Sequence, residues 1–105
     1  MLRVLYVCAS MFVLVQPGFG QEARAQRGFQ FVRTNCATCH AIGRIGESPL
    51  AIAPPLRDLH KRYPVEDLAE SFSEGIVTGH PTMPQFQLDA ARIGDLLAYL
   101  KTLER

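Results

Sequence analysis

The five residues Cys36-Ala37-Thr38-Cys39-His40 constrain the fold of this chain more than any other feature of its sequence. Positions i, i+3 and i+4 of a helical turn share one face, so two thiols and one imidazole point in the same direction. This spacing is typical of c-type haem attachment, because the two thiols can form thioethers with the two vinyl groups while the imidazole reaches the iron. The motif therefore predicts one covalent haem c, bound through Cys36 and Cys39, with His40 as an iron ligand.

Other interpretations of the cysteine pair fit the rest of the chain less well. A thioredoxin-like pair expects a βαβ context, and no segment here alternates like a strand. A structural zinc site needs four ligands in paired spacing, whereas His60 and His80 are too far apart to form a second pair. A disulfide across two residues closes a very small loop and constrains the chain little.

The N-terminus has the pattern of a secretory signal peptide. Residues 4–15 form an apolar run broken only by one serine, with Arg3 before it and small residues beyond it. Such a run is shorter than the roughly 20 apolar residues of a membrane-spanning helix. We therefore expect residues 1–20 to be a signal peptide, with cleavage after Gly20 or as late as Ala25, and export to the periplasm. An uncleaved N-terminal anchor is the alternative.

The remaining residues, 21–105, form one small domain without net charge. The chain has 105 residues, with 11 basic and 10 acidic side chains, and Arg3 is the only charged residue before Gln21. The length excludes a large multi-domain enzyme. The balanced charge provides no basic field for nucleic acid. Because a chain of this size builds only a thin core, a covalently attached haem would complete it.

Helical periodicity and loop residues predict an all-α domain with long loops. Apolar residues recur at helical spacing, Pro64 suits a first helical turn, Gly75 suits a helix end, and Asp89 suits an N-cap. Gly and Pro concentrate in two intervening stretches. The expected helices lie at about 25–37, 56–62, 64–75 and from 89 to the C-terminal end, and the expected loops at 41–55 and 76–88.

The second iron ligand is expected far along the sequence from the motif. Met83 lies in the loop at 76–88 and is followed by Pro84, whose fixed φ stiffens the backbone. A loop can carry such a side chain across the haem face opposite His40. His60 and His80 are the chemical rivals, because imidazole also ligates iron well. A Met/His pair raises the reduction potential of the iron.

Together these features resemble the small mono-haem class I cytochromes c of the bacterial periplasmic type. The resemblance extends over residues 25–103 and rests on four stretches, of which the first is the most specific. They are Cys36-Ala37-Thr38-Cys39-His40, Ala53-Pro54-Pro55-Leu56, Met83-Pro84 and Leu96-Leu97-Ala98-Tyr99-Leu100. The family fold is all-α, with three to five helices around one covalent haem.

The resemblance also implies individual residue roles. Cys36 and Cys39 would hold the haem, and His40 and Met83 would ligate its iron. The carbonyl of Pro54 would accept a hydrogen bond from the His40 ring and fix its orientation.

Gly28 would let the first helix cross the last one closely, near Leu96 and Tyr99. This role would explain a glycine that helix propensity disfavours by about 1 kcal/mol.

The chain also departs from the family pattern. It has no Trp, which many relatives place beside a haem propionate, and Tyr63, Arg44 or Arg57 are the candidates for that contact. It has no lysine-rich face either, because Lys61 and Lys101 are its only lysines. Docking through a strongly basic ring is therefore not expected.

The resulting functional hypothesis is a periplasmic one-electron carrier rather than an enzyme. Its partners would be redox proteins, it would meet membranes only through partner complexes, and a monomer is the default expectation. A first alternative is a haem-bearing electron-transfer subunit or domain partner of a larger oxidoreductase complex. A second alternative is a haem enzyme or gas sensor with an open iron position, which requires Met83 to leave the iron free.

Overall fold

A computed structural model describes residues 3–4, 6–13, 19–76 and 83–105. These residues contain no strand, which confirms the expected all-α class. The helical elements are α1 (Phe19–Asn35), the 3₁₀ helices η1 (Leu56–Lys61) and η2 (Val65–Asp67), α2 (Leu68–Glu74) and α3 (Ala90–Thr102). In the described part of the chain, no helix combines the length and the apolar character required to cross a membrane.

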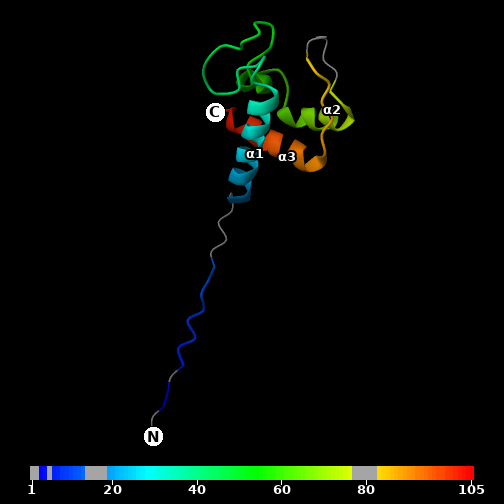
Figure 1. Ribbon diagram of the computed structural model, residues 1–105. Coiled ribbons are helices and arrows are strands. Elements are labelled where there is room, and N and C mark those ends of the chain that lie inside the picture. Colours follow the sequence, from blue (N-terminus) through cyan, green and yellow to red (C-terminus); the bar gives the residue numbers. More distant parts are fainter. Residues whose placement is uncertain (1–2, 5, 14–18, 77–82) are drawn as a thin grey trace.

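The helices lie close to their predicted positions, with one clear difference at the N-terminus. Helix α1 begins at Phe19 rather than at about residue 25. The added residues end in Gln-Glu-Ala-Arg, which are all strong helix formers, and they directly precede the periodic segment. The described residues before α1, 3–4 and 6–13, are exposed and extend away from the helices (Figure 1). The signal peptide at 1–20 stays a prediction.

Helices α1 and α3 cross closely, and Gly28 is the point of contact (Figure 1). A Cβ atom at Gly28 would lie 2.0 Å from the backbone oxygen of Asp95 and 2.8 Å from Cβ of Tyr99. The crossing is reinforced by the rings of Phe29 and Tyr99, whose centroids are 5.5 Å apart. An ion pair of 3.1 Å joins Arg27 to Asp95 beside it. The predicted close approach of the first and last helices is therefore present.

The core lies between this helix pair and the η2–α2 unit. Val32 of α1 and Val65 of η2 have the most deeply buried large side chains. The other members of the buried cluster come from η1, α2, α3 and the residues that flank α3: Leu56, Leu68, Phe72, Leu88, Ile93, Leu96, Tyr99, Leu100 and Leu103. This cluster occupies one side of a cavity, so the core is thin, as expected for a domain of this length.

Polar contacts from side chains order the loop at 41–55. The Arg57 guanidinium donates to the carbonyl of Gly46 over 2.6 Å. The Arg44 guanidinium donates to the carbonyl of Thr102 over 2.7 Å, at the end of α3. The hydroxyl of Tyr99 donates to the carbonyl of Ile42. These contacts give a Gly- and Pro-rich segment a defined path around one side of the cavity.

Replacing Asp89 by Ala is expected to lower the free energy of unfolding by about 1 kcal/mol. Asp89 is the N-cap of α3, and its Oδ1 accepts a hydrogen bond of 2.9 Å from the backbone N–H of Arg92. Asp67→Ala is the matched control, because Asp67 occupies the N-cap of α2 without such a bond. Urea unfolding of the haem-bearing protein measures both variants. Equal losses would contradict the capping role.

Candidate haem-binding site

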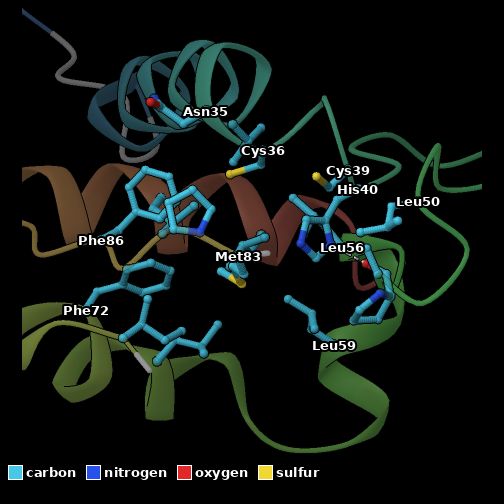
Figure 2. A pocket seen from close by; sticks show the side chains of 18 of the residues that line it. Asn35, Cys36, Cys39, His40, Leu50, Leu56, Leu59, Phe72, Met83 and Phe86 are labelled. Carbon is cyan, nitrogen blue, oxygen red and sulfur yellow. Dashed lines mark hydrogen bonds between the residues drawn. The ribbon is translucent and has the colours of Figure 1, made fainter. Parts of the chain in front are cut away.

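A cavity of about 290 Å³ lies between α1, η1, α2 and α3, and it collects the residues that the sequence singled out (Figure 2). Its wall is predominantly apolar. The apolar lining residues are Val32, Leu50, Ile52, Ala53, Leu56, Leu59, Leu68, Phe72, Ile76, Phe86, Leu96 and Leu100. Cys36, Cys39, His40, Pro54 and Met83 line the same cavity. An apolar wall with a few convergent ligating groups suits a large flat cofactor.

The end of α1 directs the motif into this cavity. The backbone N–H of Cys36 donates to the carbonyl of Val32 over 2.8 Å, which continues the helix for one step. The N–H groups of Cys39 and His40 then both donate to the carbonyl of Cys36, over 3.2 and 2.9 Å. The motif thus forms one tight helical turn beyond Asn35, and its three side chains line one cavity as the i, i+3, i+4 spacing predicts.

His40 is oriented by the loop that follows it. Its Nδ1 lies 2.7 Å from the carbonyl oxygen of Pro54, the residue that the sequence indicated for this contact (Figure 2). A carbonyl can only accept, so Nδ1 carries the proton and Nε2 keeps a free lone pair. A hydrogen bond of this kind fixes both the tautomer and the ring orientation of a ligating histidine. His40 is therefore prepared to ligate a metal through Nε2.

Met83 enters the cavity from the segment that leads to α3. Its side chain is half-buried and lines the cavity together with His40 (Figure 2). Of its rivals, His60 is half-buried but does not line the cavity. His80 lies outside the described residues, as does Thr82. Among the histidines and methionines described, only His40 and Met83 reach this cavity.

The surroundings of the cysteines fit a thioether site better than the alternatives. Cys36 and Cys39 are free and do not form a disulfide. Over the described ranges, no three His, Cys, Asp or Glu side chains gather as a metal site would require, which counts against structural zinc. Burial, and secondarily the neighbouring Cys39, raises the pKa of the Cys36 thiol to about 11. A site that disfavours a thiolate suits the neutral sulfur of a thioether.

Three other polar residues line the cavity wall, and the sequence indicated only one of them. Asn35, Arg62 and Tyr63 line the cavity, and only Tyr63 had been a candidate for a propionate contact. The other two candidates, Arg44 and Arg57, do not line it, because their guanidinium groups bind backbone carbonyls elsewhere. Asn35 and Arg62 were both missed by sequence reasoning, and Arg62 is the charged one of the two. Its position directly before Tyr63, at the end of η1, is the only signal that could have indicated it.

Comparisons with known proteins indicate the family of this chain. The family model described as Cytochrome c matches residues 25–104. The chain is 33% identical to a "Cytochrome c-553-like" protein of Synechocystis sp. (strain ATCC 27184 / PCC 6803 / Kazusa), over 97% of this chain and 94% of that protein. It is 25% identical to "Cytochrome c-552" of Bradyrhizobium diazoefficiens, over 92% of this chain and 91% of that protein. No solved structure matches the chain significantly.

Proposed function

This chain belongs to the cytochrome c family, and on that premise we propose that it is an exported one-electron carrier with His40 and Met83 as iron ligands. Family membership establishes a covalently bound c-type haem, electron transfer through it and redox proteins as partners. The observation that carries the finer proposal is the convergence of Cys36, Cys39, His40 and Met83 on one apolar cavity.

Each residue of the site has a separate task in this proposal. Cys36 and Cys39 hold the haem covalently from one edge of the cavity. His40 presents Nε2, because Nδ1 donates to Pro54. When bound, the haem iron supplies a one-electron couple between its ferric and ferrous states. Met83 would supply a neutral thioether as the second iron ligand, and a Met/His pair raises the reduction potential.

Ligation by both His40 and Met83 would favour a carrier over an enzyme or a gas sensor. A small molecule can reach the iron only after Met83 is displaced. The predominantly apolar wall would also give the iron surroundings of low polarity in both oxidation states. The exchange of electrons then depends on brief encounters with redox proteins, whose interfaces are typically below about 1,200 Å². A monomer is sufficient for this task.

Export is supported by the N-terminal residues. The signal peptide pattern at 1–20 precedes the helical domain, and its described residues make no part of the buried core. Removing them leaves the cavity and its lining intact. Attachment of c-type haem to this chain after export to the periplasm agrees with that arrangement.

The ligation is tested by comparing Met83→Leu with the unaltered protein. Leu has a similar volume but no sulfur, so the variant is expected to lose the far-red sulfur-to-iron band of the ferric protein. Its ferrous form is expected to bind carbon monoxide promptly, whereas the unaltered protein should not. Leu59→Met, elsewhere on the cavity wall, is the control and should keep a low-spin spectrum. Prompt carbon monoxide binding by the unaltered protein would instead support an open iron site.

A further inference from the structure

The C-terminal end of α2 is joined to the segment that follows Met83. The last four carbonyls of a helix lack partners within the helix. In α2, the carbonyl of Phe72 accepts from the backbone N–H of Leu88 over 2.8 Å. The carbonyl of Ser73 accepts from Nε2 of Gln87 over 3.2 Å. Gln87 and Leu88 therefore supply hydrogen-bond donors to two carbonyls that have no partner within the helix.

A sharp turn at Gly75 completes this connection. Gly75 has φ of +100°, a conformation that strains any residue with a Cβ atom. A Cβ there would also lie 2.7 Å from Nε2 of Gln85. Directly after the turn, the backbone N–H of Ile76 donates to the carbonyl of Phe86 over 2.9 Å. We call the contacts between residues 72–76 and 85–88 the α2 clamp.

The clamp lies next to Met83 along the chain. The hydrogen bond between Ile76 and Phe86 joins two residues ten positions apart in the sequence, and Met83 is three positions before Phe86. Phe86 also lines the cavity, and its ring meets that of Phe31 edge-on, with centroids 6.2 Å apart. The backbone of Phe86 is thus bound to the end of α2 while its side chain is bound to α1. Both contacts limit where Met83 can lie.

We propose that the α2 clamp keeps Met83 on the iron, with Gly75 and Gln87 as positioning residues. The proposal rests on the proposed ligation by Met83. A displaced ligand gains more conformational freedom when the loop that carries it is longer. With the clamp intact, displacement frees only the loop closed by Ile76 and Phe86. Without the clamp, the free segment extends from Gly75 to Asp89, so displacement of Met83 becomes easier.

The test is the affinity of the ferric holoprotein for imidazole, which competes with Met83 for iron and abolishes the far-red band. In Gly75→Ala, the positive φ at this position becomes strained, and opening the clamp relieves the strain. This variant should therefore bind imidazole about fivefold more tightly, or more. Gln87→Ala removes one hydrogen bond and should tighten binding roughly twofold to tenfold. Gln87→Ala also keeps the proposal testable if Gly75→Ala does not fold.

Three control variants separate the clamp from general effects. Gly43→Ala adds a Cβ in a loop where no atom lies within 4 Å of it. Gln26→Ala removes an exposed amide from α1, at a position that lines neither the cavity nor the surface beside the clamp. Phe29→Leu weakens the packing on Tyr99 at the α1–α3 crossing, and so lowers global stability away from the clamp. All three should bind imidazole as the unaltered protein does.

The outcomes distinguish the clamp from the ligation on which it depends. A far-red band in the unaltered protein, with tighter imidazole binding only in the two clamp variants, supports the proposal. If the unaltered protein has the band but the two clamp variants bind imidazole as the controls do, the clamp is overturned and Met83 remains the ligand. Equal tightening in Phe29→Leu also overturns it, because global stability then explains the effect. A missing band in the unaltered protein overturns the ligation by Met83 and the clamp together.

Discussion

Replacing Gly28 by Ala is expected to lower the free energy of unfolding by about 3 kcal/mol or more. The new Cβ would lie 2.0 Å from the backbone oxygen of Asp95 and 2.7 Å from its carbonyl carbon. These are backbone atoms in the middle of α3, so they cannot rotate away as a flexible side chain could. Helix propensity opposes this loss, because Ala is favoured over Gly by about 1 kcal/mol. The steric term is larger, and it decides the sign.

Urea unfolding of the purified haem protein measures this effect, and Gly94→Ala is its matched control. Gly94 is in α3, and a Cβ there meets nothing within 4 Å. The same substitution should therefore stabilise the protein by roughly 0.5–1 kcal/mol. If the free energy of unfolding falls in Gly28→Ala and rises in Gly94→Ala, the α1–α3 contact, rather than helix propensity, determines the effect at Gly28. A stabilised Gly28→Ala protein would mean that the helices do not cross at this position.

Replacing both Cys36 and Cys39 by Ala is expected to abolish covalent haem attachment and most of the stability of the domain. The two sulfur atoms are the only groups of the motif that can form thioethers. Without the haem, the apolar side chains that line the cavity of about 290 Å³ lose the group that they pack against. A domain of this size has only a thin core, so this loss removes much of its stability. The variant should therefore accumulate poorly and unfold readily.

Haem staining after denaturing electrophoresis measures covalent attachment directly. The control is Cys8→Ala, because Cys8 is exposed and lies within the expected signal peptide. That variant should stain as strongly as the unaltered protein. Haem that remains bound to the double variant through denaturation would contradict attachment at Cys36 and Cys39.

The parts of the site that sequence reasoning predicted are those fixed by short-range spacing. Cys36, Cys39 and His40 lie within one helical turn, so their convergence follows from local geometry. The all-α class followed from apolar periodicity, and Gly28 was recognisable as a glycine that propensity disfavours. Pro54 required the family resemblance, because nothing in its own surroundings selects one of two adjacent prolines.

The parts that sequence reasoning missed depend on which partners the ends of long arginine side chains reach. Arg44 and Arg57 were reasonable candidates for a propionate by composition. Their guanidinium groups instead bind carbonyls of Thr102 and Gly46, whose positions are set by the path of the loop at 41–55. Arg62 reaches the cavity wall because η1 ends beside it. No pattern of spacing encodes such choices.

The α1–α3 crossing has a consequence for the order in which the exported chain matures. Its ion pair joins residues 68 positions apart, Arg27 and Asp95. In the export that we propose, the thiols of Cys36 and Cys39 would leave the membrane before the segment that becomes α3. Since Leu96 and Leu100 form part of the cavity wall, the thiols stay accessible until the last residues arrive. Because of this long sequence separation, the thiols are open to haem attachment first, and the cavity wall is completed only when the C-terminal segment is present.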